Sequence, residues 1–201
     1  MNARLASRHR VSKMLISIAC HCFWALQAIA SENPEQVIKS GTDQVLKILN
    51  EQPENTLARR EAIQAIVDEY FDFEGIARYV LGPRWNDQPP EKQQKFTRDF
   101  SKLLTNTIGD IGNYANAKIT YNQKGMGQDH AVIEALVSRN WAGQVGIDYY
   151  LYLKNGNWKV QDVTVQGISL VNNYRCQFAA ILSRSSFDDL LKQLEKKVTH
   201  G

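Results

Sequence analysis

The segment from Trp158 to Phe178 changes its hydrophobic period halfway along, and this change constrains the fold more than any other feature of the chain. Residues 158–165 are rich in Val and Thr and predict a strand, whereas the apolar residues after Gly167 recur at helical spacing. Gly167 permits a sharp turn, and Ser169 can cap the helix behind it. The segment therefore predicts a last strand that leads directly into an amphipathic helix.

The first thirty residues have the parts of a secretory signal peptide. Four Arg and Lys residues precede a mostly apolar run over 14–29, and Ala28-Ile29-Ala30 is typical of a cleavage site. A membrane-anchoring helix is disfavoured, because the run falls short of the ~20 apolar residues that a span needs. We therefore expect residues 1–30 to be removed and residues 31–201 to form a single domain.

Removal of this segment changes the charge and the cysteine content. The whole chain has 24 Lys and Arg against 21 Asp and Glu, and residues 1–30 hold four of the basic residues and none of the acidic ones. The remaining 20 against 21 give a net charge of −1, so the charge provides no evidence for nucleic-acid binding. Cys176 remains alone, which predicts no internal disulfide and a small buried side chain in the last part of the fold.

Four helices are predicted in the first half of the domain, each with an apolar stripe at helical spacing. Asn33-Pro34 opens the first helix, and Asp72 can cap the third. The breaks between helices fall at Gln52-Pro53 and Gly82-Pro83. The fourth helix is expected to begin at Pro89-Pro90 and to end near Gly112.

Four strands are predicted in the second half, at 118–123, 131–139, 143–154 and 158–165. The two last strands are joined at Asn155-Gly156, which is typical of a two-residue hairpin turn. A further helix is expected near 187–198. Helices followed by a meander indicate an α+β domain, in which N-terminal helices pack on a curved, four-stranded antiparallel sheet and a C-terminal helix closes it.

Motifs for catalysis are sparse. The sequence has no P-loop, no G-x-S-x-G and no G-x-G-x-x-G, and too few Cys and His residues remain for a zinc site, so we expect no metal and no cofactor. Asp162 is unfavourable inside a strand, and Arg175 follows on the helix that should fold back. We expect the two to form a structural ion pair or network; the alternative is an enzyme in which Asp162 or Asp148 acts as general base.

The aromatic and aliphatic residues allow two interpretations. They form a closed core, or the helices and the curved sheet leave an apolar cavity for a ligand. A core face and a pocket wall have the same periodicity, so spacing does not distinguish them.

Two long blocks resemble the MlaC family of periplasmic phospholipid-binding proteins, also called toluene-tolerance auxiliary proteins. The first runs from Phe71 to Gly82, FDFEGIARYVLG, and is followed by Trp85. The second comprises Asp162-Val163 and the run GISLVNNYR from Gly167 to Arg175, followed by Gln177-Phe178. Both blocks stand in the family's order behind a signal peptide, and the resemblance spans nearly all of the mature chain.

The resemblance implies a monomeric periplasmic carrier with no catalytic step. Such a carrier moves phospholipid between an outer-membrane lipoprotein–porin complex and an inner-membrane ABC transporter with an MCE-domain subunit. This movement maintains outer-membrane lipid asymmetry. Its acyl tails lie in an apolar cavity between helices and sheet. A protein-interaction module of the cell envelope is a further alternative.

Residues expected to line this cavity come from inward positions of the strands and from facing positions of the helices. Trp158 and Val160 stand at even positions of the last strand, whereas Val163 and Val165 stand at odd positions. A bulge near Asp162 would bring all four side chains to one face, so we predict one there. The candidate lipid-binding residues are Phe73, Ile76, Val80, Leu104, Ile108, Ile133, Ala135, Val145, Ile147, Tyr149, Leu151, Val163, Val165, Tyr174 and Phe178. Asp162 and Arg175 are the candidate structural residues.

Overall fold

The computed structural model describes residues 32–200 except 53, 55, 110–116 and 140–142. The predicted signal peptide and the predicted helix end near Gly112 lie outside the described residues. The helices are α1 (Pro34–Glu51), α2 (Leu57–Tyr70), α3 (Phe73–Leu81), the 3-10 turn η1 (Gly82–Trp85), α4 (Pro90–Gly109), α5 (Leu170–Leu182) and α6 (Phe187–His200). The strands are β1 (Lys118–Met126), β2 (His130–Arg139), β3 (Gly143–Lys154), β4 (Asn157–Val165) and β5 (Ile168–Ser169).

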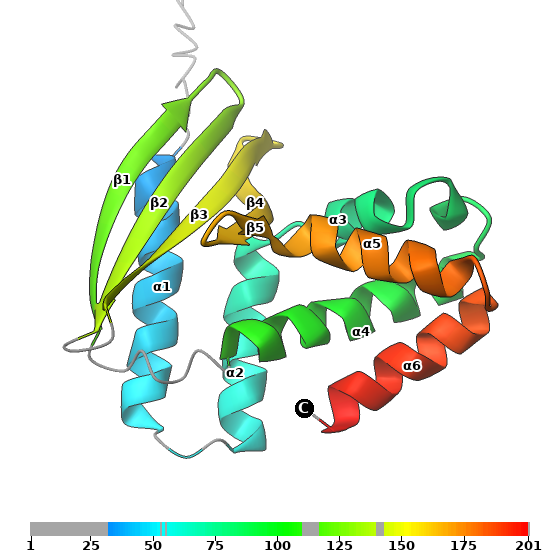
Figure 1. Ribbon diagram of the computed structural model, residues 1–201. Helices are drawn as coiled ribbons and strands as arrows, with labels where there is room; N and C mark the ends of the chain where they lie inside the picture. Colours follow the sequence, from blue (N-terminus) through cyan, green and yellow to red (C-terminus); the bar gives the residue numbers. More distant parts are fainter. Residues whose placement is uncertain (1–31, 53, 55, 110–116, 140–142, 201) are drawn as a thin grey trace, which may run out of the picture.

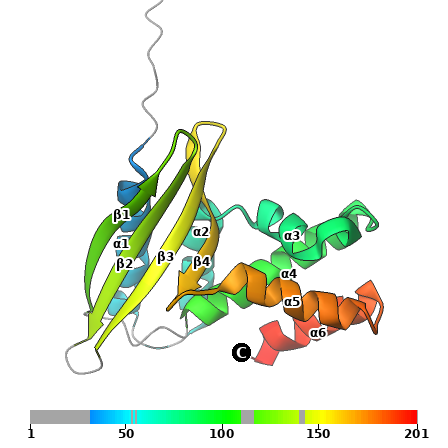
Figure 2. The ribbon, with the colours of Figure 1, turned by 45° about the horizontal axis from the view of Figure 1, so that its top comes forward.

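The elements form two groups that lie side by side. Strands β1 to β4 form a twisted antiparallel sheet with α1 along one face, and α3 to α6 form a helical group beside it (Figures 1 and 2). Helix α2 stands between the groups and contacts α1, α4 and β4. This is the α+β architecture that the sequence predicts.

The sheet has five strands in the order β1-β2-β3-β4-β5, so the prediction of four strands was one short. The fifth is a two-residue strand that pairs with Thr164 and Val165 after a turn at Gln166 and Gly167, both of which have positive φ. Ser169 then caps α5 as predicted, with its hydroxyl oxygen 2.9 Å from the Asn172 amide. The chain was expected to pass from strand to helix in one step, but the turn is tight enough to add a short return strand.

The predicted bulge in β4 is confirmed. Tyr150 pairs with Asp162 while Leu151 pairs with Val160, so Gln161 is the extra residue. The bulge restores parity, because Trp158, Val160 and Val163 are then all buried on the inward face. That face is a continuous apolar surface along the strand.

Buried side chains form two clusters. The helical cluster is built around Phe96 and Phe100 of α4, which contact Tyr174 and Phe178 of α5 at ring-centroid distances of 5.2 to 5.4 Å. The sheet cluster joins the inward face of the strands to α1. Cys176 is exposed on α5, so the prediction that it is buried was wrong. The apolar stripe of α5 faces α4, and Cys176 lies outside it.

The two groups are joined at Asp72. Its amide donates to the Val160 carbonyl at 3.1 Å, next to a parallel bridge between Phe71 and Val160. Its buried carboxylate caps α3 by accepting from the Gly75 amide at 3.1 Å. The same carboxylate accepts from Lys154 Nζ at 2.8 Å and from the Tyr152 hydroxyl, both on β3. One side chain therefore fixes the start of α3 to the sheet.

We predict that Gly75→Ala weakens this joint. A Cβ at position 75 would lie 2.3 Å from Asp72 Oδ2, so the capping carboxylate must move away from its donors. We expect the free energy of unfolding to fall by about 1–2 kcal/mol, although alanine is the better helix former. Urea denaturation checks this.

Gly127→Ala is the matched control. A Cβ there would come no closer than 3.5 Å to the His130 carbonyl oxygen, so the change should stay within about 0.5 kcal/mol. Equal stability of the two variants would contradict the role of Gly75.

Candidate functional site

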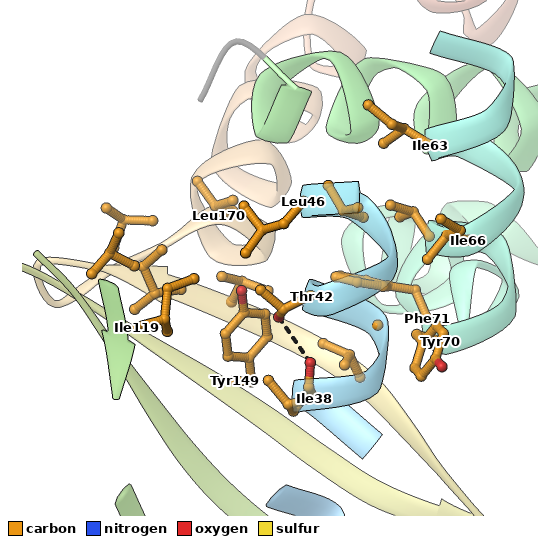
Figure 3. A pocket seen from close by; sticks show the side chains of 18 of the residues that line it. Ile38, Thr42, Leu46, Ile63, Ile66, Tyr70, Phe71, Ile119, Tyr149 and Leu170 are labelled. Carbon is orange, nitrogen blue, oxygen red and sulfur yellow. Dashed lines mark hydrogen bonds between the residues drawn. The ribbon is translucent and has the colours of Figure 1, made fainter. Parts of the chain in front are cut away.

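An apolar cavity of about 400 Å³ lies between α1, α2 and the inward face of the sheet (Figure 3). This volume is in the range of small-molecule sites in proteins. The lining residues come from α1 (Ile38, Gly41, Thr42, Val45, Leu46, Leu49), from α2 and the residue after it (Ile63, Ile66, Val67, Tyr70, Phe71), and from the sheet and the start of α5 (Ile119, Val137, Ile147, Tyr149, Val160, Val163, Val165, Leu170).

The described lining residues include no charged side chain. The Thr42 hydroxyl donates within its own helix to the Ile38 carbonyl at 2.8 Å. The Tyr70 hydroxyl accepts a hydrogen bond from Gln44 Nε2 at 2.8 Å. Tyr70 is half-buried, and this burial raises the pKa of its phenol. The described part of the lining therefore offers an apolar ligand a large contact area and no ionic partner.

Backbone features set the shape of this cavity. Side chains alternate along each strand, so Ile147 and Tyr149 both point toward α1 while Asp148 points to the opposite face. Gly41 lies where α1 meets α2, and a Cβ there would stand 3.2 Å from the Tyr70 ring. A glycine at this position lets the two helices approach and cover the sheet.

Four of the predicted lipid-binding residues line the cavity: Ile147, Tyr149, Val163 and Val165. Ile133, Ala135, Val145 and Leu151 lie on the same inward face of β2 and β3, but the structure places them outside the lining. Ile133, Ala135 and Leu151 are buried there by neighbouring side chains. Whether any of these residues contacts a ligand stays a prediction.

The structure does not bring the predicted helix positions to the cavity. Phe73, Ile76, Val80, Leu104, Tyr174 and Phe178 are all buried in the helical cluster. Their helices were expected to cover the sheet, but α3, α4 and α5 pack mainly on one another and on α6. The side chain of Ile108 lies outside the described residues.

The helical wall of the cavity instead comes from α1 and α2, which the predicted site omitted. Ile38, Val45 and Leu49 belong to an apolar stripe that spacing alone reveals. One further signal was available: Gly41 interrupts this stripe in the middle of a helix, and such a glycine often marks a close approach of two elements.

The two candidate structural residues do not pair with each other in the described structure. Asp162 accepts hydrogen bonds from the Val163 amide at 2.7 Å, the Val171 amide at 3.2 Å and the Ser169 hydroxyl. The Arg175 guanidinium lies 4.6 Å from the centre of the Tyr79 ring. Asp162 thus braces the start of α5 against β4 through a hydrogen-bond network, as one of the two expected arrangements requires, but the donors are the Ser169 hydroxyl and two backbone amides instead of Arg175.

Other carboxylates are also engaged in structural contacts. Asp148 binds Lys124 Nζ at 2.8 Å, and Lys124 also lies 2.9 Å from Glu134 on the outer face of the sheet. The described residues contain no group of three His, Cys, Asp or Glu side chains that could hold a metal ion. None of the helices in the described part of the chain combines the length and hydropathy that a membrane span requires.

A family model and two known proteins that resemble this chain all point to the same family. Residues 39–196 match a family model described as MlaC protein. The chain is 28% identical over 176 residues to the toluene tolerance protein ttg2D of Pseudomonas putida, and this alignment covers 81% of this chain and 79% of that protein. It is 22% identical over 182 residues to the intermembrane phospholipid transport system binding protein MlaC of Haemophilus influenzae, covering 86% and 85%.

A solved structure has the same fold. It is the phospholipid-binding protein from Ralstonia solanacearum in complex with a phospholipid, and it aligns with a TM-score of 0.74 at 24% identity. The alignment covers 83% of this chain and 97% of that chain. The likeness shows the α+β fold of helices and antiparallel sheet.

We predict that Asp72 makes folding sensitive to acid. Burial alone would raise the pKa of its carboxyl, but hydrogen bonds from Lys154, Tyr152 and the Gly75 amide outweigh burial and hold the pKa below its usual 3.8. A carboxyl with a depressed pKa stabilises the fold above its unfolded pKa, and this stabilisation is lost as the pH falls through the folded value.

Asp72→Asn should therefore lower the free energy of unfolding by about 2–3 kcal/mol at pH 7. The difference from wild type should begin to shrink as the pH falls through the unfolded pKa near 3.8. It should be lost only below the lower folded pKa, where the carboxyl is protonated in both states of the wild type. Denaturant titrations at pH 7, 5 and 3 measure it. A difference that is the same at all three values would contradict the assignment.

Proposed function

The chain belongs to the MlaC family, and we propose that it is a periplasmic carrier of glycerophospholipid with no catalytic step. It exchanges lipid with an outer-membrane lipoprotein–porin complex and with an inner-membrane ABC transporter that has an MCE-domain subunit, and so maintains outer-membrane lipid asymmetry. The observation that carries this proposal is the apolar cavity of about 400 Å³, whose described lining residues include no charged side chain. The names of the relatives, which refer to phospholipid transport and binding, support the same ligand.

Acyl chains explain why a carrier needs such a cavity. Two chains have roughly 30 methylene groups, and at ~0.8 kcal/mol each their exposure to water costs about 25 kcal/mol. The charged headgroup avoids a desolvation cost by staying in water. A site for this ligand therefore requires apolar volume rather than a polar recognition motif, and the described lining has that character.

The same cavity is costly when empty. At ~24 cal/mol per Å³, an unfilled volume of about 400 Å³ corresponds to roughly 10 kcal/mol. Total domain stability is about 5–15 kcal/mol. We infer that the protein holds lipid when purified and that the cavity shrinks or opens when lipid leaves.

The positions of the carboxylates favour a carrier over the enzyme considered above. Asp162 and Asp148 do not line the cavity, and each is held by donors on neighbouring elements. A general base must reach a bound substrate, and these side chains lie on the other face of the sheet from the apolar volume.

We predict that Ile147→Trp expels lipid. Ile147 is buried on the cavity wall, and an indole there occupies volume that an acyl chain would fill. We expect phospholipid per protein, measured by mass spectrometry of organic extracts, to fall at least fivefold. The overpacking should cost about 1–3 kcal/mol of stability.

Thr120→Trp is the matched control, because Thr120 is exposed on the outward face of β1 and does not line the cavity. It should retain the wild-type lipid content. Full lipid content in a folded Ile147→Trp protein would contradict the assignment of this cavity to the tails.

A further prediction concerns stability without lipid. A ligand at 1,000 times its Kd stabilises a fold by about 4.1 kcal/mol, which for a domain of this size corresponds to a Tm shift of roughly 8–16 °C. Delipidated protein should melt lower than the purified form by this amount, and added phospholipid should restore the Tm. Calorimetry of the three samples checks it; identical melting of all three would count against lipid binding.

A further inference from the structure

We propose that the exposed face of α3 and α5 is a docking surface for an acidic surface of the MCE-domain subunit, the inner-membrane partner with which lipid is exchanged. This inference rests on the proposed function, because a carrier must meet a partner at the membrane to transfer its lipid. We define the arginine face by five exposed residues, Arg78, Tyr79, Arg84, Asn172 and Arg175.

The charge of this face differs from that of the domain. Arg78 and Arg84 follow one another along α3 and η1, and Arg175 lies on α5, which runs beside α3 in both views (Figures 1 and 2). Glu74 is the acidic residue that α3 contributes, so the arginines outnumber it three to one. Residues 31–201 as a whole are nearly neutral, with 20 basic and 21 acidic residues.

Tyr79, Asn172 and Arg175 are held by contacts with one another, and Arg78 is held by contacts with neighbouring residues of α3 and η1. The Tyr79 hydroxyl donates to Asn172 Oδ1 at 2.9 Å, and the Arg175 guanidinium covers the Tyr79 ring. The Arg78 guanidinium lies 5.7 Å from the centre of the Trp85 ring and pairs with Glu74. Groups that are already ordered lose less entropy on binding. Tyr, Trp and Arg are also the residues most enriched at binding hot spots.

A second hollow of about 430 Å³ opens beside Tyr79, between α3, α5 and the outward face of β3 and β4. Its apolar and aromatic wall includes Tyr79, Tyr150 and Val171, and it can receive an anchoring side chain. Asp72 and Asp162 also line it, but each carboxylate already accepts three hydrogen bonds. A protein surface with protruding side chains fits such a hollow better than a flat membrane surface does.

The composition of the face favours carboxylates as its partner groups. All three cations are arginines, whose planar forks bind carboxylates in a bidentate way. An acidic protein surface with an anchor for the hollow therefore satisfies both features.

Docking here would act on the wall of the lipid cavity. Neighbouring residues along the chain face opposite hollows: Phe71, Tyr149 and Leu170 line the lipid cavity, while Asp72, Tyr150 and Val171 line the outer hollow. The two are separated by a single layer of backbone. A partner that pulls on the start of α5 thus moves a segment that also encloses the tails.

The test uses the full-length mature protein with its lipid and a double variant, Arg84→Glu with Arg175→Glu. The probe is the purified extramembrane domain of the MCE-domain subunit from the same organism, measured by calorimetry at 50 and 300 mM salt. We expect the variant to bind at least tenfold more weakly at low salt. Wild-type affinity should fall steeply with salt, because exposed charge pairs are screened.

Lys192→Glu with Lys197→Glu is the matched control, since both lysines are exposed on α6. It changes the net charge equally and should alter the affinity less than twofold. A second variant, Arg175→Lys, keeps the charge but loses the planar group, and we expect an intermediate affinity.

Three results would overturn the proposal: no binding of the subunit by wild type, equal weakening by both double variants, or arginine-dependent binding to anionic vesicles in place of the subunit. The lipid content of every variant, measured by mass spectrometry, distinguishes failure of the docking proposal from failure of the proposed function. Variants that retain lipid and lose docking support the inference. Wild-type protein without lipid would instead contradict the carrier itself.

Discussion

The carboxylate of Asp72 holds together the two halves of this protein. Buried at 8% exposure, it satisfies the first turn of α3 and also accepts from Lys154 and Tyr152 on β3. Burial of a carboxylate is unfavourable unless several donors surround it. Gly75 leaves the space that this arrangement needs. This contact helps to set the position of the helical group relative to the sheet, and with it the shape of the outer hollow that Asp72 lines.

The two halves have different packing, and the difference suits a carrier. The helical group has an interior filled by aromatic rings in mutual contact, with Phe96 and Phe100 fully buried. The other half borders an apolar volume that the described side chains leave unfilled. Close packing in one half can offset the cost of empty volume in the other, because unfolding exposes both together when the domain behaves cooperatively.

Sequence patterns predicted the elements well and the site only in part. The cap at Ser169, the hairpin at Asn155-Gly156 and the bulge near Asp162 depend on local residue chemistry, and the structure has all three. The cavity depends on which apolar stripes meet. Spacing gives Tyr174 and Ile38 the same signature, yet Tyr174 lies in the helical core and Ile38 lines the cavity. That choice is made by tertiary packing, which no local pattern encodes.

Strand alternation explains how one thin wall can serve two environments. Residues 149 and 150, like 162 and 163, send successive side chains to opposite faces, so the lipid side is apolar while the outer side also has carboxylates. The bulge at Gln161 keeps this alternation in phase on both sides of Asp162. A one-residue shift without it would turn Val163 outward and Asp162 toward the tails, which would place a carboxylate in an apolar cavity. The separation of a lipid-binding side from a polar outer side therefore depends on a single extra residue in β4.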